Sequence, residues 1–336
     1  MGSMHMRVLS QINGVDVVAS VDPRRERHEW MRRAYPLTAV FATLEQALER
    51  TERVDFAVVA VPAPDLYEIG MAVLGANLPV LVEKPLAGCE RDGRALVEEA
   101  ESRGLLLGVG HVERCNPAVI ALKQRLDAGA IGRIYQIYAR RLSPFPARDS
   151  MLGVSLDLAT HDIDVMRYLI GAEVDSVFAE SARRLHDSAE DLIAATLRFA
   201  DSTIGLLEVN WLTPAKVREL VVTGEGGAFV VNYLSQELRF FSHPTEATKR
   251  DVLGSMRGAG EGDMVRYALQ RHEPLQVEWE SFLKAMEGAD TPLASGRDGY
   301  AALSTACAIQ QSGVSREAVA PSYRMAGAAR SADMVS

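Results

Sequence analysis

Cysteine and long apolar stretches are both scarce in this sequence of 336 residues. Its three cysteines, Cys89, Cys115 and Cys307, lie far apart and form no C-x-x-C pair, so neither a disulfide framework nor a metal site is predicted. No apolar stretch reaches the roughly 18 residues that cross a bilayer, and the first residues lack the apolar core of a signal peptide. We therefore expect a cytoplasmic protein that does not interact with membranes.

A surplus of positive charge is also missing. Lysine and arginine number 36 against 45 aspartates and glutamates, which gives a net charge of -9. Binding of nucleic-acid phosphates requires Lys and Arg clustered on one face, whereas the basic runs here are short and those at 24–25 and 32–33 are flanked by acids. Nucleic acids are therefore excluded as expected partners, and small molecules are favoured.

What is present is the composition of a soluble globular protein, with 48% hydrophobic and 24% charged residues. A chain of this length favours two domains. Between residue 15 and about residue 110, apolar strands alternate with helices: we expect strands at 15–21, 56–61, 79–82 and 105–109, and helices at 24–35, 44–50 and 91–102. This alternation predicts an α/β domain with a doubly wound parallel sheet.

The pattern changes after a helix expected at 118–128. Strands then follow one another without intervening helices, which predicts an α+β domain with a large, mostly antiparallel sheet. We expect strands at 133–140, 175–180, 193–199, 203–211, 218–223, 228–233 and 237–241, and helices at 156–169, 277–286 and 299–311. The predicted domains cover residues 1–117 and 118–325, followed by a flexible tail at 326–336.

The most informative local feature is Glu83-Lys84-Pro85, which directly follows the apolar strand at 79–82. Such a strand is typical of a parallel sheet covered on both faces, and ligands bind outside the carboxyl ends of these strands. Lys84 is therefore a candidate functional residue. From these residues alone, a solvated loop cation beside Glu83 is an equally good interpretation.

A carboxylate and an imidazole are spaced for contact in the helix at 156–169. Asp157 and His161 are four residues apart, so both side chains project from the same face of a helix. Imidazole is well suited to accept a proton near neutral pH, and a nearby carboxylate can orient it. A purely structural helix histidine is the alternative. We expect Asp162 and Asp164 to cap the helix or to be solvated on its outer face.

Asp22 ends the strand at 15–21, a position from which a carboxylate can bind the ribose hydroxyls of an adenine nucleotide. The alternative is an N-cap for the following helix. Arg24 and Arg25 could pair with a 2′-phosphate, so NADP is not excluded, although the acid favours NAD.

Polar residues also follow the strand at 105–109. His111, Arg114 and Asn116 lie at the same predicted sheet edge as Lys84. A polar exit loop and a substrate-binding role are equally good interpretations of this stretch. The histidines and acids do not have the spacing of metal ligands, so no metal is expected.

Taken together, Glu83-Lys84-Pro85 after a sheet strand and Asp157 with His161 in a helix before an antiparallel sheet closely resemble the Gfo/Idh/MocA oxidoreductases. The resemblance covers nearly the whole chain. It implies an NAD(P)-dependent sugar or cyclitol dehydrogenase with an N-terminal Rossmann domain and a C-terminal domain whose open sheet commonly mediates oligomerisation, here into a homodimer or homotetramer.

Two stretches, residues 110–117 and 156–164, look most like the branch of this family that acts on nucleotide sugars. Some members of that branch oxidise carbon 3 of a UDP-sugar. The resemblance therefore implies a nucleotide-sugar substrate, with carbon 3 of a UDP-hexose as the best expectation. The 3-keto product would feed a partner PLP-dependent aminotransferase in the biosynthesis of amino sugars and antibiotics.

The same resemblance implies roles for individual residues. Lys84 would hydrogen-bond the reacting hydroxyl near the nicotinamide, His161 would remove the hydroxyl proton, and Asp157 would hold His161 or a substrate hydroxyl. The residues implied for cofactor binding are Gly2, Asp22, Pro62, Glu83 and Lys84, and those implied for substrate binding are Arg114, Asn116 and Asp157.

The chain departs from the family pattern at three places. Leu66 stands where the family often has a histidine, and Cys115 stands where an aromatic is usual. The first Rossmann strand and its G-x-G-x-x-G turn are missing, and Gly2 matches the third glycine of that turn by resemblance. We expect the natural start to lie upstream, and a sheet without this strand to expose apolar edges. The missing turn leaves open a non-catalytic sugar-nucleotide-binding protein or partner subunit.

Overall fold

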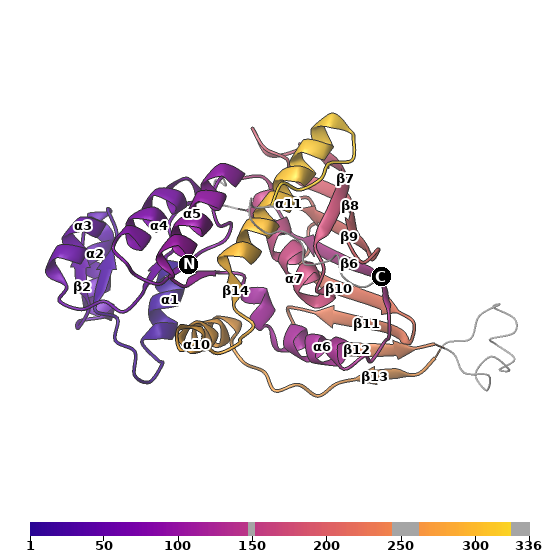
Figure 1. Ribbon diagram of the computed structural model, residues 1–336, viewed down its shortest axis with the longest axis horizontal. Coiled ribbons are helices and arrows are strands. Elements are labelled where there is room, and N and C mark those ends of the chain that lie inside the picture. The colour runs from indigo at the N-terminus through magenta and orange to yellow at the C-terminus, as the bar shows by residue number, and fades with distance from the viewer. Residues whose placement is uncertain (147–151, 244–261, 324–336) are drawn as a thin grey trace, which may run out of the picture.

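The computed structural model describes residues 1–146, 152–243 and 262–323. Figure 1 shows the helices and short strands of the first half on one side and the strands of a large sheet on the other, with α11 (Gly296–Ser315) running between them. None of the helices in these ranges is long and apolar enough to cross a membrane. The predicted tail at 326–336 lies outside the described residues.

Short parallel strands alternate with helices in the first half, as predicted. β4 (Val80–Val82) pairs in parallel with β3 (Ala57–Val59) and with β5 (Leu107–Val109), and its three side chains are completely buried. β1 (Ala19–Val21) pairs in parallel with β2 (Ala39–Phe41). The helices are α1 (Gly2–Leu9), α2 (Arg25–Ala34), α3 (Leu44–Arg50), α4 (Leu66–Gly75) and α5 (Glu90–Arg103).

The parallel sheet of the described residues is divided into two pieces. β1 and β2 form one piece, whereas β3, β4, β5 and β14 (Ala294–Ser295) form the other. The usual strand order places the first Rossmann strand between these pieces. Two valines at β1 are partly exposed, Val18 to 41% and Val21 to 40%. That a sheet without this strand exposes an apolar edge stays a prediction.

The chain returns to the first sheet near its end, which the sequence did not predict. β14 pairs antiparallel with β5, and α10 (Pro274–Met286) packs against α1 and β4. Trp279 and Phe282 of α10 are completely buried beside Val8 and Leu81. The boundary between residues 117 and 118 stays a prediction, but residues 274–295 pack with the first sheet rather than with the second.

Within the described ranges, the second sheet has eight strands in the order β13-β12-β11-β10-β6-β9-β8-β7. All neighbouring strands are antiparallel except β6 and β9, so the predicted fold class is confirmed. The strands are β6 (Ile134–Leu142), β7 (Val174–Ala182), β8 (Leu192–Phe199), β9 (Ile204–Asn210), β10 (Val217–Gly224), β11 (Gly227–Asn232), β12 (Glu237–Ser242) and β13 (Met264–Arg266). β13 was not predicted because it is short and carries no alternating pattern.

α11 joins the two sheets through close packing. A Cβ atom added at Gly299 would lie 2.5 Å from a methyl group of Val109 in β5, and one added at Gly93 would lie 2.7 Å from Leu303. Glycine at position 299 therefore permits α11 to approach β5 this closely, whereas at position 93 the Leu303 side chain would have to move. α11 also contacts α7 (Thr160–Ile170), the helix that follows the predicted Asp157 and His161 pair.

Candidate active site

Lys84 and Asp157, 73 residues apart in the chain, form an ion pair at the carboxyl end of β4. Lys84 Nζ donates to Asp157 Oδ1 at 2.9 Å and to the Asp157 backbone oxygen at 2.6 Å. Their side chains are only 15% and 18% exposed. Lys84 is thus a fixed, largely buried cation, and not a solvated loop residue. The peptide bond between Lys84 and Pro85 is cis.

Asp157 lies in a π-helical turn, η3 (Ser155–Ala159), which runs directly into α7. π-helical turns are rare and are frequent at functional sites. The sequence predicted an uninterrupted α-helix, with Asp157 contacting His161. In the described residues Asp157 instead pairs with Lys84, and no hydrogen bond joins it to His161. A role for Asp157 in binding a substrate hydroxyl stays a prediction.

His161 lies in the first turn of α7, and its Nδ1 atom is buried without a partner among the described residues. Burial lowers the pKa of His161 well below its usual value, and the nearby cations of Lys84 and Arg141 lower it further. The imidazole is therefore neutral at pH 7. A neutral imidazole can accept a proton.

His111, at the end of β5, is the nearest aromatic neighbour of His161 that the ring contacts show. The two ring centroids are 6.3 Å apart with their planes at 82°, and His111 is 3% exposed. In the part of the chain that the structure describes, neither ring nitrogen of His111 has a partner. Burial lowers its pKa below the usual value. His111 therefore belongs to the site itself, which supports the ligand-binding interpretation of the stretch after β5 over a polar exit loop.

Glu83 supports Lys84 from inside the protein. Its Oε1 accepts a hydrogen bond from His5 Nε2 at 2.8 Å, and its Oε2 accepts one from the Lys84 backbone N–H at 3.2 Å. His5 Nδ1 in turn accepts a hydrogen bond from the indole N–H of Trp279 at 3.0 Å. Because Nδ1 is an acceptor, the ring proton lies on Nε2, from which it is donated to Glu83. His5 and Trp279 gave no signal in the sequence, because they are 274 residues apart.

Two aspartates of α7 are completely buried, so the prediction that Asp162 and Asp164 face solvent is wrong. Each is held by an arginine from another element. Arg141 donates to Asp162 at 2.5 and 3.1 Å and to Glu113 at 3.1 Å, and Arg114 donates to Asp164 with two hydrogen bonds of 2.7 Å. Paired charges of this kind tolerate burial, whereas isolated ones do not.

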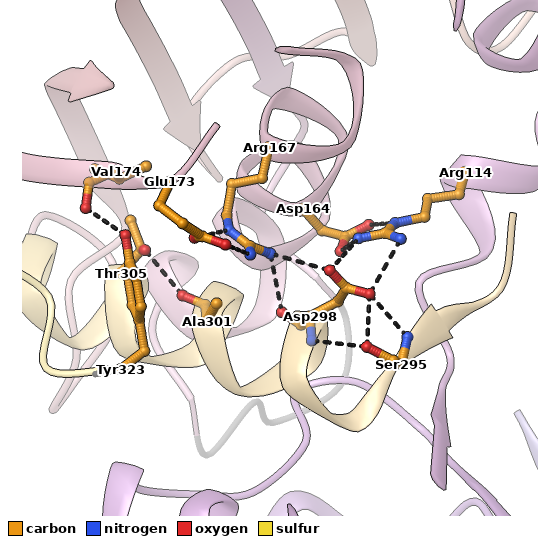
Figure 2. Close-up of polar contacts among 10 residues, drawn as sticks. All are labelled: Arg114, Asp164, Arg167, Glu173, Val174, Ser295, Asp298, Ala301, Thr305 and Tyr323. Atoms are coloured by element: carbon orange, nitrogen blue, oxygen red, sulfur yellow. Dashed lines mark hydrogen bonds and ion pairs between the residues drawn. The ribbon is translucent and has the colours of Figure 1, made fainter. Parts of the chain in front are cut away.

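Arg114 and Asn116, predicted to bind substrate, have their polar groups paired inside the protein. Arg114 bridges Asp164 and Asp298, as Figure 2 shows. Asn116 caps α6 (Pro117–Asp127): its Oδ1 accepts from the N–H of Ala118 at 3.1 Å. Substrate binding by these two residues stays a prediction, and the contacts observed are those of the protein framework.

The residues predicted to hold the cofactor follow successive parallel strands. Pro62 comes after β3, and Glu83 and Lys84 come after β4 in the same sheet, at the carboxyl ends of strands where dinucleotides bind. Asp22 comes after β1, which belongs to the other piece of the sheet. Asp22 accepts hydrogen bonds from the side chain and backbone N–H of Arg24 at 2.9–3.0 Å, and this side-chain bond lowers the pKa of Asp22. Gly2, at the start of α1, has open space around its Cα. These positions fit an adenine dinucleotide.

The two departures from the family pattern inside the site region are both buried. Leu66 begins α4 and is 1% exposed, and Cys115 is also 1% exposed. Burial raises the pKa of the Cys115 thiol. Leu66 therefore cannot supply the polar group of the histidine that the family often has there. Cys115 stays a protonated thiol and does not act as a reactive thiolate.

Comparisons with known proteins cover both halves of the chain. A family model described as an oxidoreductase family with an NAD-binding Rossmann fold matches residues 1–111, and a model of the GFO/IDH/MocA C-terminal domain matches residues 119–230. The two matches meet near the predicted boundary between the domains. Both halves of the fold thus match the same kind of protein.

Individual relatives differ in what their names say they act on. The UDP-N-acetylglucosamine 3-dehydrogenase of Acidithiobacillus ferrooxidans is 25% identical over 76% of this chain and 78% of its own length. The myo-inositol dehydrogenase Hyg17 of Streptomyces leeuwenhoekii is 30% identical over 63% of this chain and 67% of its own. The WlbA dehydrogenase of Bordetella pertussis, solved with NADH and UDP-GlcNAcA, has the same fold, with a TM-score of 0.77, 22% identity and 95% of each chain covered.

Proposed function

Since the chain belongs to the Gfo/Idh/MocA family of oxidoreductases, we propose that it oxidises a secondary hydroxyl of a nucleotide sugar by hydride transfer to NAD. The family supports an NAD-dependent dehydrogenase acting on CH–OH. For the reacting position we propose carbon 3 of a UDP-hexose, in keeping with the relative named a UDP-N-acetylglucosamine 3-dehydrogenase. The 3-keto sugar would then be the substrate of a PLP-dependent aminotransferase.

The observation that carries this proposal is the fixed Lys84 and Asp157 pair beside a neutral His161, whose Nδ1 atom has no partner among the described residues. These three residues combine a cation, a carboxylate and a proton acceptor at the sheet edge where the cofactor binds. A merely structural site would not leave a buried imidazole nitrogen without a partner among the described residues, because such groups are costly.

The chemistry assigns one task to each side chain. As the carbon–hydrogen bond breaks, its electron pair leaves as hydride and the oxygen becomes electron-rich. The Lys84 ammonium stabilises the developing alkoxide, and His161 takes the hydroxyl proton, so that a carbonyl group forms. Asp157 holds the Lys84 ammonium in place through the 2.9 Å ion pair. NAD, when bound, supplies the two-electron acceptor.

A second candidate is a dehydrogenase of a neutral cyclitol, favoured by the 30% identity to a myo-inositol dehydrogenase. The non-catalytic alternative predicts ligand binding without reduction of the cofactor. NADH absorbance, together with a measurement of ligand binding, separates the three. Oxidation of UDP-N-acetylglucosamine supports the proposal, and oxidation of myo-inositol supports the second candidate. Binding of a UDP-sugar without formation of NADH supports a non-catalytic protein.

The catalytic assignment is tested by Lys84→Ala. We expect the variant to bind NAD like the parent protein but to lose turnover by about 10²- to 10⁴-fold, the range for loss of one electrostatic or acid–base group. The matched control is Lys123→Ala, because Lys123 pairs with an aspartate on the surface of α6. Undiminished turnover of Lys84→Ala would place the chemistry elsewhere.

The proton acceptor is tested by His161→Ala. Because the pKa of His161 is lowered, the acid limb of the pH profile of kcat/KM should lie below pH 6.5 in the parent protein. The variant should lose this limb together with most of its turnover. A profile with the same limb in both proteins would assign the proton to another group.

A further inference from the structure

Arg218 is a largely desolvated arginine of the second sheet without an acidic partner. Its Nη1 atom donates to the backbone oxygens of Leu142 at 2.8 Å and Val217 at 3.0 Å. Among the described residues no carboxylate lies within 4.0 Å of its guanidinium, and its Nε and Nη2 atoms have no partner. In contrast, Arg114, Arg141 and Arg167 each bind at least two acidic side chains.

The position of Arg218 in the sheet directs it toward the site. It lies directly opposite Arg141 across the β6 and β10 pair, and it shares a face of β10 with Leu220 and Val222, which are completely buried. Arg141 binds Asp162, the residue next to His161. Arg218 is therefore placed beside the same end of α7 as the predicted proton acceptor.

The next strand adds a second unpartnered group at the same level. The N–H of Tyr233, at the end of β11, donates to the Arg218 backbone oxygen at 3.0 Å, which places Tyr233 beside Arg218. Tyr233 is 4% exposed, and its hydroxyl has no partner in the part of the chain that the structure describes. Arg141, Arg218 and Tyr233 thus form a cross-strand row.

The charges in this row do not balance locally. Like charges opposite each other destabilise a sheet, and the described carboxylates that act on Arg218 are already paired: Asp162 and Glu113 bind Arg141, and Asp157 binds Lys84. Burial and the neighbouring Arg141 charge lower the pKa of Arg218 to about 10, although nearby acids, Asp162 foremost, act in the opposite direction. The guanidinium would gain from an anion that supplies the missing hydrogen bonds.

We propose that Arg218 is a specificity-determining residue that binds an anionic group of the substrate, a phosphate or a carboxylate, at the row of Arg141, Arg218 and Tyr233. This inference rests on the proposed function, because it assigns Arg218 to the substrate of the same site. It implies that the site distinguishes charged sugars from neutral sugars and cyclitols through this one guanidinium.

Isothermal titration calorimetry on the full chain tests the inference in the presence of NADH, which cannot accept hydride from an alcohol and so prevents turnover. The probes are UDP-glucose, glucuronate and glucose, which differ in the presence of a diphosphate or a carboxylate. We expect Arg218→Gln to weaken binding of a charged probe roughly 10- to 100-fold, the effect of losing hydrogen bonds to a charged group, and to leave glucose unchanged within about 3-fold. Arg218→Lys, which keeps the charge, should recover part of the loss.

The control is Arg140→Gln, because Arg140 neighbours Arg141 on the opposite face of β6 and pairs with Glu208 at 3.2 Å. A selective loss for UDP-glucose assigns the phosphate, and a selective loss for glucuronate assigns the carboxylate. Equal losses for all three probes, no loss for any, or a parent protein that binds charged probes no better than glucose would overturn the inference. Because binding is measured without turnover, failure of the catalytic assignment is recognised separately from failure of this one.

Discussion

Replacing Asp298 with asparagine should destabilise the folded protein. The Asp298 carboxylate, in the first turn of α11, binds both Arg114 and the α7 residue Arg167 (Figure 2). One oxygen lies 3.2 Å from Arg114 and 3.5 Å from Arg167. The other accepts hydrogen bonds from the N–H and the hydroxyl of Ser295 at 3.0 and 2.7 Å, in a capping box. Asparagine keeps an oxygen for the cap but loses the charge.

The expected cost follows from these contacts. Breaking a buried ion pair costs about 3–5 kcal/mol, but the Asp298 side chain is 29% exposed and Arg114 keeps Asp164, so we expect about 2 kcal/mol for Asp298→Asn. Asp298→Ala also removes the Asp298 half of the capping box, which is worth about 1 kcal/mol, and should cost about 3 kcal/mol, while the Ser295 hydroxyl still accepts from the backbone N–H of residue 298. The difference between the two variants therefore isolates this half of the capping box.

Urea denaturation followed by circular dichroism at pH 7 measures these values. The control is Arg297→Gln at the neighbouring position, whose ion pair with Glu101 is 61% and 42% exposed and should contribute less than about 1 kcal/mol. Equal free energies of unfolding for Asp298→Asn and Arg297→Gln would refute the argument that this carboxylate supports the framework.

The same carboxylate makes a prediction for acid pH. Burial opposes ionisation of Asp298, but Arg114, the Ser295 cap and Arg167 together hold its pKa well below the usual range. Since the folded protein binds this proton more weakly than the unfolded chain, the stabilisation is present above about pH 4 and is lost as the pH falls further. The difference between parent and Asp298→Asn should therefore shrink below pH 4.

Three further outcomes are expected. Burial lowers the pKa of both His111 and His161, so the unfolded chain binds these protons more tightly than the folded protein does. The free energy of unfolding should therefore fall as the pH drops below about 6.5. A free energy of unfolding that stays constant from pH 7 to pH 5 would contradict this. Cys115 is buried with a raised pKa, so Ellman's reagent should modify it only after unfolding, which mass spectrometry of the labelled peptide can check. A Cβ at position 110 would lie 3.1–3.2 Å from the Glu83 carboxylate, so Gly110→Ala should cost about 1–2 kcal/mol in urea denaturation, and an unchanged midpoint would show that Glu83 moves freely.

Much of the fold could be predicted because the strands of the second sheet are long and alternate clearly between buried and exposed side chains. β7 and β8 illustrate this, with Val177, Ala179, Ile193 and Leu197 buried and their neighbours exposed. β2, β13 and β14 were missed, because strands of two or three residues are too short to show a hydrophobic period. Their positions depend on the partner strand and not on their own sequence.

The candidate site was predicted in its members but not in its contacts. Lys84, Asp157 and His161 each follow a recognisable local pattern, yet the observed pair joins Lys84 to Asp157. The π-helical turn that turns Asp157 toward Lys84 has no local sequence signal. Asp162 was assigned to solvent because its partner Arg141 lies on a strand 21 residues away, and charge pairing across such distances depends on the completed fold.

The return of the chain through α10 and β14 limits how this protein can be divided or recombined. A fragment that ends at Asn116 would lose the edge strand on β5 and would expose the apolar surface that Trp279 and Phe282 now cover. Its truncated core would favour aggregation over autonomous folding. Exchange of the second sheet between relatives, whether by recombination in evolution or by design, would therefore have to keep residues 274–295 together with the first 116. The segment that has to be exchanged as one piece is therefore discontinuous in the sequence, although its parts pack together in the folded protein.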